Sequence, residues 1–490
     1  MALSVTPQRL QAFLGQALTR IELTPELEEA IAIGQWISTY LWKNNHGLYH
    51  WDALEERLTS KVHAALGNDQ STSQRTEPTE RTELHVATEV YAFGGHSSLM
   101  RQLVQQGTPH AIDVLVTGTD AVANTASCLG IPPSRVLKVP RADTALDRIR
   151  HTLNAMRAYQ QLVLHIHPND LETALAVRLL KAELPDVRVH FVNHADHAYS
   201  VAIGAANRVL EISQYGWALR SQRDSLERSS FLGIPIQISA DLEPKHPTDS
   251  DKILTGGASF KFQPVGKRSL PSALATMLQR EKISLDVIGP KKGDWWWWPL
   301  KARFPTRVKI HRMLPKEQYQ KLLKNCSLYI DSYPLPGGTA FPEALMRGCK
   351  VSGMLGLVWG YSPADELLAS TPEDFLAQCK ALVLNDPEQQ IRQDQARAKC
   401  IQYHAPQHVR RRLDEVMSTD RLIQPPPSPL PPPSTQSWAQ SWMGKHAPAM
   451  PSSRESSVSP KNRRWLARQQ LAMHGLRHRS AWRLLRHAFS

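Results

Sequence analysis

Two glycine-rich segments carry residue types that bind phosphate groups or move protons. The first contains Gly94-Gly95-His96, directly before a segment with helical spacing. Paired glycines let a ligand approach the backbone closely, and an imidazole titrates near neutral pH, so His96 could act as a general base toward a bound hydroxyl. A tight strand-to-helix turn with Ser97 as the N-cap explains the same residues without any chemistry. Both interpretations stay open on these residues alone.

The second glycine-rich segment covers residues 331–348 and contains Gly337, Gly338 and Thr339. Free backbone N–H groups and a hydroxyl at the start of a helix can hold a diphosphate without a metal ion. Glu343 lies one helical turn further on, where its carboxylate could accept hydrogen bonds from ribose hydroxyls. The alternative is an N-capped helix that serves only the core.

A third group of polar residues, His194, Asp196 and His197, follows a candidate strand. Asp196 could orient a histidine or act as a base itself, and the alternative is hydrogen bonding that only supports the fold. The earlier pair His165 and His167 is expected to serve packing and a satisfied turn. The candidate catalytic residues are His96, Asp196 and His197.

The strands that position these residues are predicted from short β-rich runs that alternate with segments of helical pattern. This alternation predicts βαβ units and parallel sheets, in two Rossmann-like halves. In such halves ligands bind at the carboxyl ends of the strands, which is where the candidate residues lie. The predicted strands are 84–90, 111–117, 135–139, 161–166 and 187–193 in the first half, and 252–255, 283–288, 307–311, 326–331 and 350–354 in the second.

The flanking segments divide the chain further. Residues 1–67 have the apolar spacing of helices, and 68–82 are a polar linker. The two halves are expected at 83–240 and 252–423, the second with closing helices. Residues 424–460 are dominated by Pro and Ser and form another linker, and 461–490 form a disordered basic tail with amphipathic helical character.

Composition limits the classes of protein that fit. The chain has 490 residues, 41% apolar and 21% charged, and no apolar run long enough for a transmembrane helix, so a soluble cytoplasmic protein is expected. The net charge of +13 is mostly a property of the tail, because residues 461–490 hold eight Lys or Arg and no acid. This tail predicts contact with the anionic inner face of a membrane, and the alternative is a flexible solvated tail or a helix docked on a partner protein. Nucleic acid is not expected as a partner of the main body.

No metal site is predicted. The five cysteines are scattered and form no Cys-x-x-Cys pair. His194 and His197 lack a third ligand, and the one Asp-x-Asp triplet, Asp249-Ser-Asp251, precedes a strand and is interpreted as a solvated linker. The run Trp295–Trp298 is interpreted as a packed loop, with contact to an acceptor or a membrane as the alternative.

Three motifs in order resemble those of GT-B nucleotide-sugar glycosyltransferases, and within them the O-GlcNAc-transferase-like group. They are the loop 255–264 with Lys261, the Pro-Lys-Glu segment with Lys316, and the glycine-rich loop with Glu343. In that family the first lysine reaches the diphosphate, the second lies beside the nucleobase, and an acidic residue holds the ribose. The resemblance covers mainly residues 252–360 and, less closely, 84–240.

The resemblance implies an α/β GT-B fold with two Rossmann-like domains facing a cleft. It implies a hexosyl- or N-acetylhexosaminyltransferase that moves a sugar from a nucleotide-diphosphate sugar, first of all a UDP-sugar, to a hydroxyl or amide of a glycan, lipid-linked or protein acceptor. No cofactor is expected beside this co-substrate. Retaining members often carry a Glu-x7-Glu pair, but Leu335 stands eight residues before Glu343, which favours an inverting, metal-independent reaction.

Two alternatives remain. A nucleotide-sugar epimerase would use the same fold without a second substrate. A non-catalytic membrane or nucleic-acid adaptor would use the Rossmann halves only as a scaffold.

Overall fold

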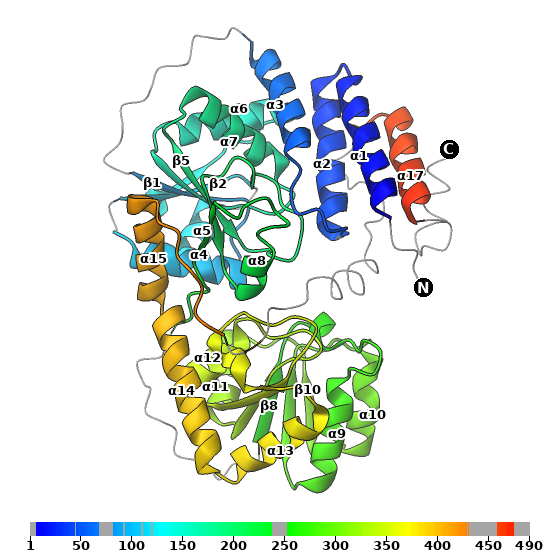
Figure 1. The fold of residues 1–490 in the computed structure, drawn as a ribbon, viewed down its shortest axis with the longest axis vertical. Helices are drawn as coiled ribbons and strands as arrows, with labels where there is room; N and C mark the ends of the chain where they lie inside the picture. Colours follow the sequence, from blue (N-terminus) through cyan, green and yellow to red (C-terminus); the bar gives the residue numbers. More distant parts are fainter. Residues whose placement is uncertain are drawn as a thin grey trace.

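The computed structural model contains two parallel β-sheets, one in each half of the chain, with helices packed on both faces of each sheet (Figure 1). This arrangement confirms the predicted α/β class. The structure describes residues 6–44, 46–67, 82–91, 94–108, 111–118, 121–237, 252–428, 430 and 458–474. The Asp249–Asp251 triplet and most of the two predicted linkers lie outside these residues.

The first sheet has seven strands in the order β3-β2-β1-β4-β5-β6-β7, all parallel. The first five confirm the predicted strands of this half. The strands are β1 (Glu83–Ala87), β2 (Ile112–Val116), β3 (Val136–Lys138), β4 (Gln161–His165), β5 (Arg188–Asn193), β6 (Arg208–Glu211) and β7 (Ser229–Phe231). The helices between them are α4 (Gly95–Gln106), α5 (Val122–Leu129), α6 (Ala145–Met156), α7 (Leu171–Glu183) and α8 (Gln214–Ala218).

The second sheet repeats this winding, with six strands in the order β10-β9-β8-β11-β12-β13. Its first five strands along the chain again confirm the prediction. The strands are β8 (Lys252–Gly256), β9 (Ser284–Ile288), β10 (Val308–His311), β11 (Leu328–Ile330), β12 (Lys350–Met354) and β13 (Leu368–Ala369). The helices are α9 (Leu270–Arg280), α10 (Trp298–Arg303), α11 (Lys316–Lys324), α12 (Ala340–Met346) and α13 (Pro372–Val383).

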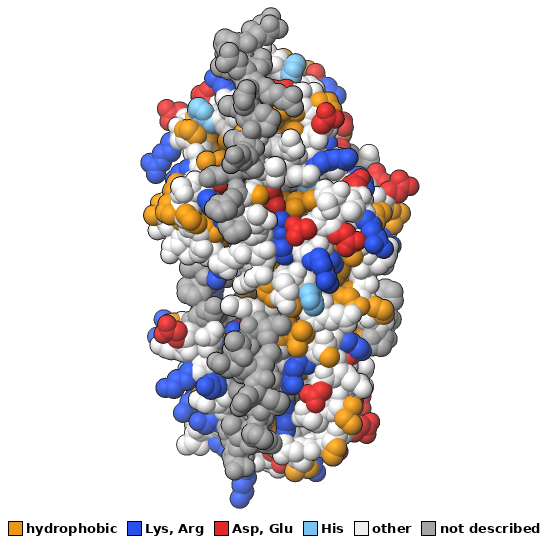
Figure 2. Space-filling model, turned by 90° about the vertical axis from the view of Figure 1, so that its left-hand side faces the viewer, with side chains coloured by type: hydrophobic (Ala, Val, Ile, Leu, Met, Phe, Trp, Pro, Cys, Tyr) orange, Lys and Arg blue, Asp and Glu red, His pale blue; other side chains and the backbone are white. Residues whose placement is uncertain are grey.

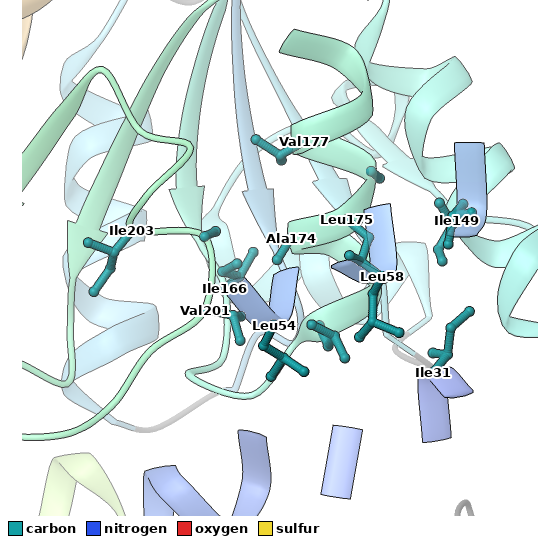
Figure 3. Close-up of a cluster of buried hydrophobic side chains, with 14 of the residues drawn as sticks. Ile31, Leu54, Leu58, Ile149, Ile166, Ala174, Leu175, Val177, Val201 and Ile203 are labelled. Atoms are coloured by element: carbon teal, nitrogen blue, oxygen red, sulfur yellow. The ribbon is translucent and has the colours of Figure 1, made fainter. Parts of the chain in front are cut away.

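The N-terminal helices share a core with the first sheet. Helices α2 (Leu27–Lys43) and α3 (Asp52–Leu66) pack beside α6 and α7, and α1 (Pro7–Glu22) packs on α2 and α3. Leu54 and Leu58 of α3 are fully buried in this cluster (Figure 3). Gly34 allows the close approach, because a Cβ at this position would lie 2.5 Å from a methyl carbon of Leu58. The predicted helical segment is therefore an added layer on the N-terminal domain.

The last two helices before the Pro-rich segment return the chain to the first domain. Helix α14 (Pro387–His404) packs on α12, whereas α15 (Pro406–Thr419) packs on α4 of the N-terminal domain (Figure 1). The prediction counted both as closing helices of the C-terminal half. The structure places α15 across the domain boundary, because Val409 and Leu413 are buried in a cluster that also contains Leu99 and Leu103 of α4.

The helical character predicted for the tail is confirmed in its first part, whereas the prediction of disorder is wrong there, because residues Pro460–His474 form helix α17, which packs beside α1 (Figure 1). Leu466 and Met473 are buried in the same core as α1 and α2, and Asn462 donates to Glu29 over 2.8 Å. The apolar side of this helix is thus already covered by the chain itself. Residues 475–490 lie outside the described part.

The tryptophan run is divided between the core and the surface. Trp297 is buried against Phe262 with ring centroids 5.3 Å apart, as the packed-loop interpretation predicts. Trp295 and Trp298 remain largely exposed. Within the described residues, no helix is long and apolar enough to cross a membrane.

Candidate functional site

The candidate residues lie at the points where each sheet reverses its strand order. These points are between β1 and β4 in the first sheet and between β8 and β11 in the second. Loops diverge from such a point and leave a crevice at the carboxyl ends of the strands. The two crevices face each other, because a Cβ built on Gly95 would lie only 3.8 Å from the methyl carbon of Thr339. The two glycine-rich loops therefore meet across one cleft.

Asp331 shapes the glycine-rich loop of the second domain. This buried carboxylate accepts hydrogen bonds from the N–H groups of Ser332 and Gly337, each over 2.8 Å. A Cβ at Gly337 would lie 2.4 Å from the Asp331 Oδ1 atom, so only glycine fits there. The expectation that Gly337 offers a free N–H is therefore wrong. Among the described residues the N–H groups of Gly338 and Thr339 donate to no acceptor, so they stay available to a ligand.

Lys261 is the cation beside this loop. It lies in a short 3-10 turn after β8, and its Nζ donates to the carbonyl oxygen of Pro336 over 2.8 Å. Burial lowers the pKa of Lys261, and the nearby Asp331 carboxylate opposes this shift. Burial also raises the pKa of Asp331 to about 7, although Lys261 opposes that shift. The helix α12 that follows the loop has only seven residues, so most of the positive charge at this place comes from Lys261.

The two remaining candidates of this domain stand on neighbouring helices. Glu343 lies in α12, and Arg347 one turn later donates to its Oε1 atom over 3.0 Å, which leaves Oε2 without a partner among the described residues. The side chain of Glu343 is partly exposed. Lys316 is the first residue of α11, and its side chain lies outside the described part.

His96 occupies the first turn of α4, on the opposite side of the cleft. Its Nε2 lies 2.7 Å from the carbonyl oxygen of His165, and since a carbonyl only accepts, Nε2 carries the proton. Burial lowers the pKa of His96, so the ring is neutral near pH 7 and Nδ1 holds a lone pair. The His194 ring lies beside it, with centroids 4.3 Å apart. Sequence reasoning placed His194 nearby only as a part of the third polar group.

Asp196 is buried and is held by its own domain. The Ser213 hydroxyl donates to its Oδ2, and His197 Nδ1 lies 3.3 Å from its Oδ1. This geometry suits Asp196 as a group that orients His197, and suits it less as a base that must reach an acceptor. His197 itself is partly exposed.

His165 makes more side-chain hydrogen bonds than the packing role predicted from the sequence requires. It is fully buried and bonded to two other histidines, His85 and His194, whereas His167 serves a turn and the packing of Trp42, as expected. The only sequence signal for this arrangement was the alternation of polar residues along strands otherwise made of apolar ones. Among the described residues no group of three or more His, Cys, Asp or Glu side chains is arranged to hold a metal ion.

Solved structures with the same architecture identify the fold. The HepE protein of Anabaena in complex with UDP matches with a TM-score of 0.53, covering 69% of this chain and 100% of HepE at 13% identity. Its complex with UDP-glucose matches with a TM-score of 0.52 over the same shares at 12% identity. The chain has the GT-B fold. An O-GlcNAc transferase variant of Thermobaculum terrenum matches with a TM-score of 0.47, covering 84% of this chain and 80% of that one at 13% identity.

These likenesses concern the fold alone, because the sequence identities are low. No protein-family model matches the sequence, and no curated protein matches it. The GT-B fold expected from the three motifs is thus confirmed, whereas the roles of individual residues stay predictions that rest on their geometry.

Proposed function

We propose that the protein transfers a sugar from a nucleotide-diphosphate sugar to a hydroxyl or amide acceptor. The observation that carries this proposal is the Lys261 ammonium beside the Gly337–Thr339 loop, where that loop faces Gly95 across the cleft. A leaving diphosphate gains negative charge as the glycosidic bond breaks, and it is stabilised by fixed cations and N–H donors. Lys261 supplies the cation, and Gly338 and Thr339 supply the donors.

The nucleoside part of the donor is assigned to α11 and α12. Glu343 keeps one carboxylate oxygen for ribose hydroxyls, and Lys316 begins the helix expected beside the nucleobase. A UDP-sugar is the preferred donor, and the HepE complexes with UDP and UDP-glucose support this choice. The transferred sugar is a hexose or an N-acetylhexosamine.

The reaction proposed is a direct, inverting displacement at the anomeric carbon without a metal ion. The position eight residues before Glu343 is Leu335, which is 5% exposed and packs in an apolar cluster with Tyr49 and Tyr215 of the other domain. No carboxylate can therefore act from that position. The acceptor's proton is taken on the N-terminal side of the cleft, where His96 and His194 offer imidazole lone pairs and Asp196 with His197 form the second candidate pair.

The acceptor is a glycan, a lipid-linked glycan or a protein, held by the N-terminal domain. The adaptor alternative is less well supported, because a nucleic-acid-binding surface needs a stripe of one charge. On the face shown in Figure 2, Lys and Arg side chains are interspersed with Asp and Glu. Peripheral membrane contact through the basic tail, residues 461–490, stays a prediction.

A panel of nucleotide sugars tests the proposal through thermal stabilisation of the full chain. A true donor at a hundred times its Kd adds about 2.7 kcal/mol to the free energy of unfolding. We expect UDP and at least one UDP-sugar to raise Tm, and the Lys261→Ala variant to lose most of this rise. Stabilisation by none of the nucleotides would refute the proposal. Incubation with the donor alone, followed by analysis of the sugar, separates transfer from epimerisation.

A further inference from the structure

A row of buried imidazoles leads away from the cleft into the N-terminal domain. His194 Nε2 lies 2.9 Å from His165 Nδ1. His165 Nε2 lies 2.9 Å from His85 Nδ1. The row ends at a carboxylate, because His85 Nε2 lies 2.6 Å from Glu83 Oε1. His85 and His165 have no exposed surface, and Glu83 has almost none. We refer to Glu83, His85, His165 and His194 as the histidine row.

The sheet explains why these residues meet. Strands β1 and β4 are neighbours in which Ala87 is paired with His165, and His85 lies two residues before Ala87 on the same face. His194 follows directly after β5, which is the next strand beyond β4. Three adjacent strands thus bring three imidazoles to one face of the sheet, toward its carboxyl edge.

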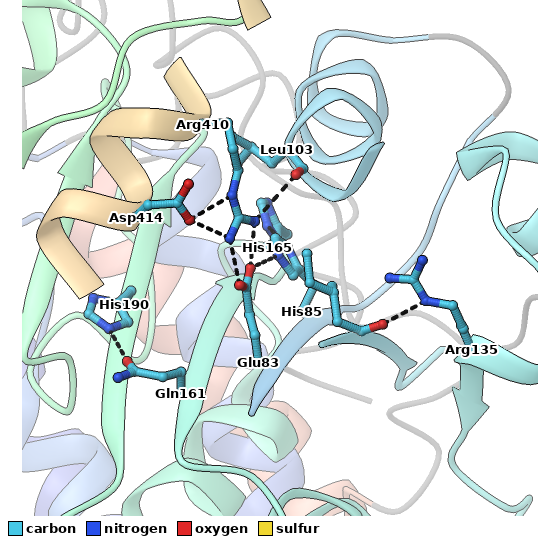
Figure 4. Close-up of polar contacts among 10 residues, drawn as sticks. Glu83, His85, Leu103, Arg135, Gln161, His165, His190, Arg410 and Asp414 are labelled. Carbon is cyan, nitrogen blue, oxygen red and sulfur yellow. Dashed lines mark hydrogen bonds and ion pairs between the residues drawn. The ribbon is translucent and has the colours of Figure 1, made fainter. Parts of the chain in front are cut away.

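The far end of the histidine row is anchored by Arg410 of α15. Its guanidinium donates to both oxygens of Glu83, over 2.8 and 2.7 Å, and also to Asp414 (Figure 4). The hydrogen bonds from His85 and Arg410 hold the pKa of Glu83 at about 2, against the effect of burial. Glu83 is therefore a carboxylate at every pH at which the protein would work.

The ring nitrogen that carries each proton of the histidine row can be assigned by starting from Glu83. A carboxylate only accepts, so His85 carries its proton on Nε2 and its Nδ1 must accept from His165. His165 then carries its proton on Nε2, and its Nδ1 accepts from His194. His194 in turn carries its proton on Nε2, which leaves a lone pair on Nδ1. The three rings are neutral in this state, because burial lowers the pKa of each below its usual value.

This lone pair belongs to the last ring of the row, at the carboxyl ends of the strands. Among the described residues none is bonded to His194 Nδ1, and His194 is only partly buried. The His96 ring lies against the His194 ring. His96 also has a lone pair on Nδ1, but its Nε2–H points to the carbonyl of His165, and among the described residues no carboxylate is bonded to this ring.

We propose that the histidine row is a proton relay that makes His194 the base of the reaction and carries the positive charge to Glu83. The proposal rests on the proposed function, and it replaces His96 as the first candidate for the base. His96 then lies beside the acceptor hydroxyl and orients it.

The relay balances in protons. The acceptor O–H bond breaks and a bond from hydrogen to His194 Nδ1 forms. The acceptor oxygen bonds to the anomeric carbon as the bond from that carbon to the diphosphate oxygen breaks, and the nucleoside diphosphate leaves with the electron pair. The Nε2 proton of His194 passes to His165 Nδ1, and the Nε2 proton of His165 passes to His85 Nδ1. His85 then holds two protons and pairs with the Glu83 carboxylate. The same steps in reverse release the proton to solvent after the products leave.

The protonation of the rings is a test that needs no substrate. In the full chain labelled with 15N-histidine, long-range 1H–15N spectra report which ring nitrogen carries the proton. We expect His85, His165 and His194 all to be neutral with the proton on Nε2. A proton on Nδ1 of neutral His194 or neutral His165 would overturn the relay, whatever the outcome of the donor panel.

Kinetics test the relay through a matched pair of variants. His85→Gln interrupts the row, whereas His190→Gln changes a histidine that is equally buried in the same sheet, bonded to Gln161 and outside the row. We expect His85→Gln to lower kcat at least 10-fold with an unchanged donor KM, and His190→Gln to leave kcat within 2-fold. Equal kcat values for the two variants would overturn the proposal.

A third variant keeps the test decisive if His85→Gln fails to fold. Glu83→Gln still accepts from His85 but cannot neutralise the transferred charge, and its expected effect is again on kcat and not on donor KM. Glu83→Gln is combined with Arg410→Met in a double variant, because Arg410 would otherwise be a buried cation that has lost its Glu83 partner. If this double variant folds, binds the donor and keeps the full kcat, the relay does not operate.

Discussion

The Lys261→Ala variant tests the assignment of the donor site. The change removes an ammonium that lies 2.8 Å from the Pro336 carbonyl, at the beginning of the Gly337–Thr339 loop. A hydrogen bond to a charged group contributes about 1.5–3 kcal/mol. If Lys261 meets the diphosphate, its loss should weaken donor binding by about 10- to 150-fold. The structure shows no second lysine or arginine bonded to this loop among the described residues that could replace it.

Calorimetric titration with UDP and with a UDP-sugar measures this loss, and Lys252→Ala is the control. Lys252 begins β8, the strand that leads to Lys261, but its side chain is exposed at the other end of the strand. The control should bind the donor as the wild type does. Equal affinity of both variants, with both chains folded, would show that the diphosphate lies away from Lys261 and would refute the reasoning.

Three further outcomes are expected. Burial raises the pKa of Asp331 from 3.8 to about 7, so the folded protein loses stability as pH rises between these two values. Thermal unfolding over this pH range should therefore show a smaller fall of Tm for Asp331→Asn than for the wild type. Glu343→Ala should raise the donor KM more than it lowers kcat, because the ribose is distant from the breaking bond; steady-state kinetics decide this. Deletion of 458–490 should lower Tm but leave donor affinity unchanged, because α17 covers α1 and carries no donor contact; an unchanged Tm would contradict the packing.

The sequence predicted ten strands correctly and missed three, and the missed ones share a physical cause. Strands β6, β7 and β13 have four, three and two residues. Shortness alone does not explain the misses, because the three-residue strands β3 and β11 were predicted. The missed strands lie toward one outer edge of each sheet, where β6 pairs with β5, β7 with β6 and β13 with β12. Long-range pairing, and not local propensity, therefore determines whether these three strands form.

The glycine-rich loop shows the same limit at the level of single residues. The motif correctly indicated a loop between β11 and a helix, and it placed Gly337 there. It could not indicate that the Gly337 N–H is used by Asp331, because that bond depends on how the loop folds back over six residues. Only the structure therefore reduces the set of candidate phosphate-binding groups to those of Gly338, Thr339 and Lys261.

The histidine row depends on contacts that are still more distant in the sequence. Glu83 and Arg410 are separated by 327 positions, and each alone is a buried charge that a sequence pattern would not predict. The end of α4 is adapted to this pair, since a Cβ at Gly107 would lie 2.8 Å from an Arg410 Nη1 atom. Helix α15 follows the C-terminal domain and brings Arg410 back to the N-terminal sheet. Before any proton moves, the buried Glu83 carboxylate is thus paired with a cation of α15, so the acceptor side of the cleft depends on a helix from beyond the donor domain.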